Sequence, residues 1–247
     1  MEKTFKFRTQ MLRYFKQLLP HEFRQRLKRS LFAHHDMNSR LLNLRRAGFS
    51  PSGTIDGGAY RGDWTLTFWS VWPDRPSLMI EPLPSQTSIL HGLAAKNKGS
   101  TVVPQAIGSK VGEVSFRLDE TNSSIIPGGP QEGTMRVACT TLDAILDVTP
   151  GFTPNFLKLD LQGHELEALS GAERHLKQFE VILLEVSVLR IGNVPIFSEV
   201  NSFMQARGYR FYDALLQYYR PRDGALWQMD AFYVREDSAL ISSRSWD

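Results

Sequence analysis

Two acidic residues near the start of the chain each end a short apolar run. Asp56 is followed directly by Gly57 and Gly58, and Glu81 ends the run 77–81. In a parallel α/β sheet, this pattern places both carboxylates at the carboxyl ends of neighbouring strands, where nucleoside cofactors bind. The spacing therefore predicts a nucleoside-binding crevice, and with it an enzyme.

The residue types in this crevice favour S-adenosylmethionine (SAM) over a dinucleotide. A carboxylate at Asp56 would repel a pyrophosphate, whereas it suits the ammonium and sulfonium groups of SAM. The dinucleotide fingerprint Gly-x-Gly-x-x-Gly has Ala59 in its middle glycine position when the register ends at Gly62. We expect Asp56 to contact the methionine ammonium, directly or through water, and Glu81 to accept both ribose hydroxyls. The other cofactor-binding residues expected from this stretch are Gly57, Gly58, Ala59, Tyr60 and Pro82.

A third acid, Asp160, ends another apolar run and is expected beside the cofactor and near the transferred methyl group. Its role has three alternatives: orienting the acceptor hydroxyl, acting as general base, or ligating a divalent cation such as Mg²⁺ together with Glu185. His164 is a second candidate for the catalytic base, because an unperturbed imidazole titrates near pH ~6.5. The alternative for His164 is a solvent-bonded residue in the first turn of a helix.

The elements that must position these side chains alternate along the chain. Apolar runs predict strands, helical periodicity predicts helices between them, and the alternation indicates a parallel, doubly wound α/β sheet. The last two runs would pair as an antiparallel hairpin, which gives a seven-stranded Rossmann-like methyltransferase sheet with an antiparallel last strand. The seven strands expected in this sheet are 52–56, 77–81, 101–104, 155–160, 179–185, 209–212 and 230–234. Two more short strands are expected at 113–118 and 135–139. The expected helices are 62–72, 85–97, 163–176 and 196–206.

From about Leu41 to Val234 the sequence resembles the FkbM family of SAM-dependent methyltransferases. Four blocks carry the resemblance, and Gln162 stands where the family usually has an acid. The resemblance implies methyl transfer to hydroxyl groups of sugars and natural products, and it places Ile107 near the adenine. The blocks are Ile55-Asp56-Gly57-Gly58-Ala59-Tyr60-Arg61-Gly62, Ile80-Glu81-Pro82, Ala106-Ile107-Gly108 with Thr140-Thr141-Leu142-Asp143, and Leu157-Lys158-Leu159-Asp160-Leu161-Gln162-Gly163-His164-Glu165.

Charge divides the chain into two expected parts. Residues 1–46 carry 12 Lys or Arg and 3 Asp or Glu, a balance of +9, whereas the rest of the chain sums to −6. We expect a basic, amphipathic, helical extension over 1–46 and a methyltransferase domain over 47–247. The extension suits a lid, a homodimer contact or a membrane surface. The single cysteine and the lack of a long apolar run favour a cytoplasmic protein.

Three other functions compete with methyl transfer to a hydroxyl or carboxylate oxygen of a small-molecule acceptor, and the first, a nicotinamide oxidoreductase, is disfavoured by the glycine register described above. The basic extension suits a nucleic-acid methyltransferase, but the sequence has no Asn-Pro-Pro-Tyr or Asp-Pro-Pro-Tyr block to hold a flipped base, which disfavours nucleic acid as a partner. A non-catalytic protein that binds a membrane or another protein through 1–46 is the third alternative. Binding of SAM would count against it.

Overall fold

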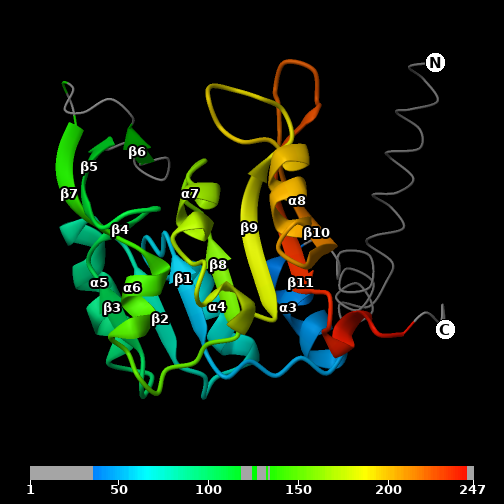
Figure 1. Cartoon of the computed structure of the whole chain (residues 1–247), viewed down its shortest axis with the longest axis horizontal. Helices are drawn as coiled ribbons and strands as arrows, with labels where there is room; N and C mark the ends of the chain where they lie inside the picture. The colour runs from blue at the N-terminus through cyan, green and yellow to red at the C-terminus, as the bar shows by residue number, and fades with distance from the viewer. Residues whose placement is uncertain (1–35, 118–123, 127–131, 133, 244–247) are drawn as a thin grey trace, which may run out of the picture.

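The computed structural model describes residues 36–117, 124–126, 132 and 134–243. At its centre lies a seven-stranded sheet of order β10-β11-β9-β8-β1-β2-β3 (Figure 1). β11 runs antiparallel to both of its neighbours and the other adjacent strands are parallel, which confirms the expected α/β methyltransferase sheet. These strands are β1 Thr54–Gly57, β2 Ser77–Ile80, β3 Thr101–Val103, β8 Phe156–Leu159, β9 Val181–Ser187, β10 Tyr209–Tyr219 and β11 Leu226–Arg235.

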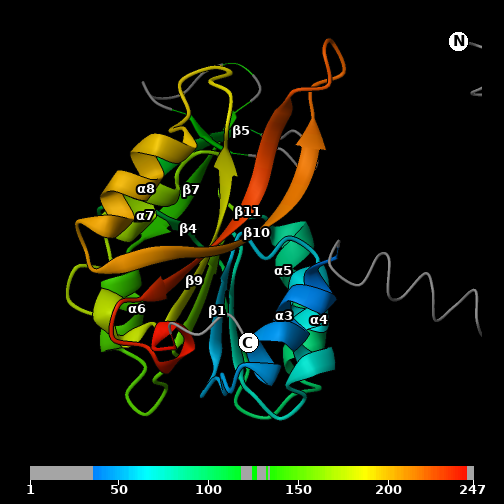
Figure 2. The same cartoon turned by 90° about the vertical axis from the view of Figure 1, so that its right-hand side faces the viewer.

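Helices cover both faces of the sheet. Figure 2 shows α3, α4 and α5 on one face and α6, α7 and α8 on the other. The helices are α3 Met37–Arg46, α4 Asp63–Val71, α5 Pro84–Ala94, α6 Leu142–Asp147, α7 Glu165–Ser170 and α8 Phe197–Gln205. None of the helices in the described part of the chain is long and apolar enough to cross a membrane.

Burial on both faces explains why the central strands read as continuous apolar runs. Every residue of β1, β2 and β8 is buried. Phe156 of β8 meets Phe68 of α4 edge-to-face, and Leu41 and Leu44 of α3 belong to the same core cluster. Within the expected extension 1–46, the described residues therefore begin with a helix packed on the sheet domain. The boundary at residue 46 stays a prediction, and residues 1–35 lie outside the described part.

A second, four-stranded sheet of order β4-β7-β5-β6 stands beside the carboxyl ends of the central strands (Figure 1). It confirms the short strands expected near 113–118 and 135–139. Its apolar residues, among them Phe116 and Val137, form a separate small core with Leu83. The sheet therefore adds a side wall to that end of the molecule. Its strands are β4 Ala106–Ile107, β5 Gly112–Arg117, β6 Ser124–Ile126 and β7 Thr134–Thr140.

Two elements differ from the sequence-based expectation. The helix expected over 163–176 ends at Ser170, because the chain turns at Gly171, where an added Cβ would lie 2.3 Å from the carbonyl oxygen of Gly108. The C-terminal hairpin is longer than expected. Register shifts after Phe211 and Leu216 interrupt its pairing, so the alternation of side chains that marks a regular strand is broken there.

Candidate active site

A cavity of about 720 Å³ opens at the carboxyl ends of the central strands. Its size is that of a small-molecule site, and its position at this edge is where open α/β sheets bind ligands. The cavity brings together most of the side chains expected from the sequence and extends across the sheet to β9 and β11. The expected site residues that line it are Gly58, Ala59, Tyr60, Glu81, Pro82, Ile107, Asp160 and Glu185.

Glu81 follows β2 and its carboxylate is held by the backbone on both sides. One oxygen accepts a hydrogen bond from the Tyr60 amide at 3.0 Å, and the other accepts one from the Leu83 amide at 3.0 Å. Burial raises the pKa of Glu81, while these two N–H groups and Lys158 act in the opposite direction. The residue is only 5% exposed, yet it lines the cavity, so a fixed hydrogen-bond acceptor borders the cavity there.

The glycine turn after β1 is clamped between β2 and β8. Gly58 has φ +69°, and the amides of Gly58 and Ala59 both donate to the Ile80 carbonyl, at 3.0 and 3.1 Å. A Cβ at Gly58 would lie 2.0 Å from the carbonyl oxygen of Asp160. The close approach of two strands at this point therefore requires glycine, both for space and for the left-handed backbone.

Asp56 occupies a different place from the one expected. It is fully buried and, like Gly57, does not line the cavity. Thr65 donates its hydroxyl to Oδ2 at 2.7 Å, and the Lys158 ammonium lies 2.9 Å from Oδ1. The carboxylate is thus neutralised behind the cavity wall, which corrects the expectation that it faces the ammonium of a cofactor.

Lys158 ties this part of the site together. Its ammonium donates to the carbonyls of Gly57 and Gly58, at 3.3 and 3.0 Å, besides pairing with Asp56. Burial alone would lower the pKa of Lys158, but Asp56 and Asp160 outweigh it and raise the pKa above its ordinary value. The buried charge therefore holds the glycine turn at a fixed distance from β8.

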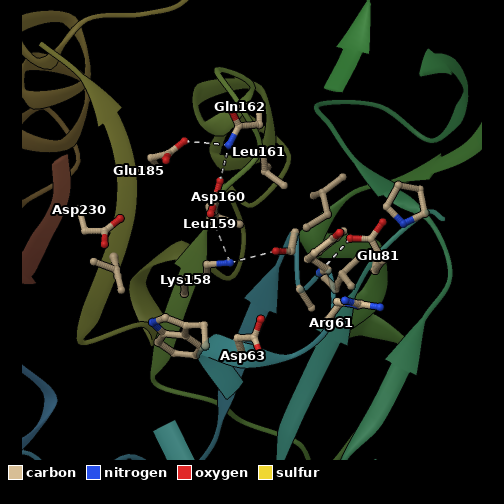
Figure 3. A pocket seen from close by; sticks show the side chains of 18 of the residues that line it. Arg61, Asp63, Glu81, Lys158, Leu159, Asp160, Leu161, Gln162, Glu185 and Asp230 are labelled. Atoms are coloured by element: carbon tan, nitrogen blue, oxygen red, sulfur yellow. Dashed lines mark hydrogen bonds and ion pairs between the residues drawn. The ribbon is translucent and has the colours of Figure 1, made fainter. Parts of the chain in front are cut away.

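Asp160 and Glu185 face each other across Gln162. The Gln162 amide nitrogen donates to Oδ1 of Asp160 at 3.0 Å and to Oε2 of Glu185 at 3.0 Å (Figure 3). Burial, followed by Asp160, Glu165 and Asp230, raises the pKa of Glu185 to about 9. The carboxylate of Asp160 stays partly exposed and borders the cavity.

The same arrangement bears on the expected Mg²⁺ site. A hard cation shared by two carboxylates needs oxygen ligands around it. Here the position between Asp160 and Glu185 holds the –NH₂ group of Gln162, which can only donate hydrogen bonds. In the described residues, moreover, no three His, Cys, Asp or Glu side chains are grouped as a metal site would require. The residues present do not fit a cation at this position.

His164 is placed away from the cavity. It precedes α7, and its Nε2 lies 2.7 Å from the carbonyl oxygen of Ile125 on the second sheet. The expectation that His164 reaches the reacting atoms is therefore corrected: the ring links α7 to β6. Beside it, the buried Glu165 accepts from the amides of Leu161 and Gly163 and holds the loop that carries Gln162.

Sequence reasoning missed several residues that line the cavity. Lys158 was read only as part of an apolar run, although a lysine inside a fully buried strand signals a buried partner. Asp230 of β11 also lines the cavity, and burial raises its pKa to about 6. The C-terminal aromatic residues were not missed: Tyr218, Tyr219 and Trp227 are candidates for an acceptor pocket from the sequence, and Tyr218 and Trp227 line the cavity. The remaining polar residues there that were not anticipated are Gln217 and Gln228.

Comparisons with known proteins give one family match and several partial similarities. Residues 56–211 match the model of the methyltransferase FkbM domain. The hexuronic acid methyltransferase AglP of Haloferax volcanii is 28% identical over 88 residues, which cover 35% of this chain and 37% of AglP. Two solved structures are similar at low identity. The methyltransferase FkbM of Methylobacillus flagellatus KT is 18% identical, with a TM-score of 0.46 over 73% of this chain and 43% of that chain. The magnesium protoporphyrin IX methyltransferase ChlM of Synechocystis PCC 6803 is 9% identical, with a TM-score of 0.48 over 80% of this chain and 76% of that chain.

The chain thus spans less than half the length of AglP and of the Methylobacillus protein. The family match, in contrast, covers more than half of this chain and runs from Asp56, at the end of β1, to Phe211 in β10. It includes the glycine turn, Glu81 and Asp160, which meet at the cavity. The chain belongs to the FkbM family of methyltransferases.

Proposed function

We propose that the protein binds SAM in this cavity and transfers its methyl group to an oxygen of a sugar or natural-product small molecule. The observation that carries the proposal is the fixed carboxylate of Glu81, which lines the cavity together with the glycine turn and Asp160. Two acceptor oxygens in one plane suit a ribose with two hydroxyls. Membership of a methyltransferase family and the partial similarity to a hexuronic acid methyltransferase support the reaction and a sugar acceptor.

The cavity can be divided between cofactor and acceptor. Gly58, Ala59 and Tyr60 would contact the methionine part, and Ile107 and Pro82 would lie against the adenine at the other side of Glu81. The methionine ammonium would then lie beside Asp160, since Asp56 is already paired with Lys158. When bound, SAM supplies a methyl group that is already activated by its cationic sulfur.

The protein therefore needs chiefly to align the acceptor and to take up its proton. We propose that the carboxylate of Asp160 accepts the proton that the acceptor hydroxyl loses. Its Oδ1 is fixed by Gln162, and its Oδ2 lies 4.0 Å from the Lys158 ammonium. This geometry orients the carboxylate while leaving it 37% exposed on the cavity side, where the acceptor hydroxyl would lie. Catalysis would rest on positioning plus one proton transfer, with no metal.

The domain division belongs to the same proposal: residues 47–247 form the catalytic unit and 1–46 an extension. A nucleic-acid acceptor and a non-catalytic binding protein are the competing functions, and both depend on the basic charge of 1–46. Most of that segment lies outside the described residues. The cavity favours a small molecule because its volume is that of a cofactor and one small acceptor.

Calorimetric titration with S-adenosylhomocysteine (SAH), and in parallel with NADH, tests this function. We expect SAH to bind the wild type and NADH not to bind. Glu81→Ala should weaken SAH binding by about tenfold or more, because hydrogen bonds to a charged group are lost. The matched control is Glu173→Gln, which removes one negative charge at an exposed position outside the cavity. Folded wild type that binds neither nucleoside would refute the proposal.

A further inference from the structure

The end of the cavity formed by β9, β10 and β11 is rich in unpaired acceptor groups. Glu185 and Asp230 lie directly opposite each other on the antiparallel strands β9 and β11, and both line the cavity. Like charges in this position repel across the strands. The fold therefore keeps two acids side by side at the end of the cavity where the acceptor would enter. We call this part the acceptor end.

Among the described residues, no Lys or Arg side chain forms an ion pair with Glu185 or Asp230. Lys158 and Arg61 are the only Lys or Arg residues among the described residues that line the cavity. Lys158 is engaged by Asp56 and two carbonyls, and Arg61 lies on the far side, near Glu81 (Figure 3). Burial raises the pKa of both acids, and the charge of Lys158 offsets only part of this effect.

Amide side chains hold one oxygen of each acid and leave the other open. Gln162 and Gln228 both donate to Oε2 of Glu185, at 3.0 and 3.4 Å. Gln217 donates to Oδ2 of Asp230. Among the described residues, Oε1 of Glu185 and Oδ1 of Asp230 have no hydrogen-bond partner. The carboxyl groups are therefore oriented, with one acceptor oxygen each available to a ligand.

The aromatic side of the acceptor end gives an independent observation. The indole N–H of Trp227 is buried and has no partner among the described residues, although Trp227 lines the cavity. A buried donor without a partner is costly, so a small turn of the ring that brings the N–H to a ligand oxygen would be favourable. The ring of Tyr218 lies 6.4 Å from that of Trp227. The pair offers an apolar surface for a sugar-sized ring and a donor for one of its hydroxyls.

We infer that the acceptor carries a protonated amine as well as the hydroxyl that is methylated, as an amino sugar or aminocyclitol does. This inference rests on the proposed function. The ammonium group would lie between Glu185 and Asp230, and the ring against Tyr218 and Trp227. A hexuronic acid, the acceptor type in the name of the partial relative AglP, would bring a third acidic group beside this pair. A neutral sugar would leave both carboxyl groups without a cation.

The test compares three sugars that share a ring and differ in charge. SAH-saturated wild-type protein is titrated calorimetrically with glucosamine, glucose and glucuronic acid at about pH 6.5, where a sugar amine carries a proton. We expect glucosamine to bind about tenfold or more tighter than glucose, and glucuronic acid to bind weakest. Because the pKa of Glu185 is raised, glucosamine binding should also release a proton, seen as a heat that depends on the buffer.

Two isosteric variants identify the residues responsible. Glu185→Gln and Asp230→Asn should each reduce the preference for glucosamine over glucose to less than about threefold, while SAH binding is retained. The exposed control Glu173→Gln should keep the wild-type preference.

Equal or tighter binding of glucose or glucuronic acid would overturn the inference. So would no sugar binding by the SAH complex, or a glucosamine preference that survives both variants. Loss of SAH binding by the wild type would instead count against the proposed function itself, so the two failures are distinguishable.

Discussion

Replacing Lys158 with methionine tests the interpretation that Asp56 serves the fold from behind the cavity wall. The two residues belong to neighbouring strands in direct register, and the Asp56 side chain is fully buried. Lys158→Met keeps the length and much of the volume of the side chain. It removes the cation that lies 2.9 Å from Asp56 Oδ1 and leaves Thr65 as the remaining partner of the carboxylate.

The expected cost follows from the burial of this pair. Breaking a buried ion pair by removing one partner typically costs about 3–5 kcal/mol, because the other charge stays buried without compensation. In a domain of this size, each kcal/mol lowers Tm by about 2–4 °C, so we expect a decrease of about 6–20 °C. Asp56→Asn should cost a similar amount. The double variant Asp56→Asn with Lys158→Met should cost clearly less than the sum of the two, because neither charge is then left alone.

Urea unfolding followed by tryptophan fluorescence measures all three variants, since Trp64 and Trp72 pack in the adjacent core. Calorimetry with SAH adds a second readout. Lys158 holds the carbonyls of Gly57 and Gly58, so the lysine variant should also bind SAH more weakly. A change below about 1 kcal/mol for Lys158→Met, or strictly additive costs in the double variant, would refute this account of the pair.

Three further predictions follow from the same site. The pKa of Glu185 is raised from 4.5 to about 9, so the native state holds an extra proton between these pH values. The free energy of unfolding should therefore fall as pH rises through this window. Glu185→Gln should flatten that pH dependence in urea titrations, and identical slopes for variant and wild type would contradict the prediction. Gln162→Glu puts a third carboxylate beside Asp160 and Glu185. Mg²⁺ should therefore raise the Tm of the variant and leave that of the wild type unchanged. A Tm increase in the wild type would contradict the metal-free site. Gly58→Ala should lower the free energy of unfolding by about 2 kcal/mol or more, because its Cβ would lie 2.0 Å from a carbonyl oxygen. The control Gly92→Ala lies in α5 with open space around it, so it should be neutral or stabilising.

The sequence alone determined the alternation of strands and helices and the acids that end strands. These features are local: a run of apolar residues followed by an acid and a glycine turn is readable without knowledge of the neighbours. Glu81 and Asp160 were placed at the cavity on that basis, and both line it. The antiparallel last strand was also predictable from two strand-like runs joined by a polar loop.

Only the tertiary structure decided which charges meet. Lys158 and Asp56 pair across strands that lie about a hundred residues apart, and Glu185 faces Asp230 because of the register between β9 and β11. A shift of one residue in either register would turn a side chain to the opposite face of the sheet, and register is set by packing. His164, four residues after Asp160, precedes α7 and bonds to the second sheet, so it does not line the cavity. The sequence thus located the edge of the sheet that carries the site, and the packing of distant strands chose the side chains that face it.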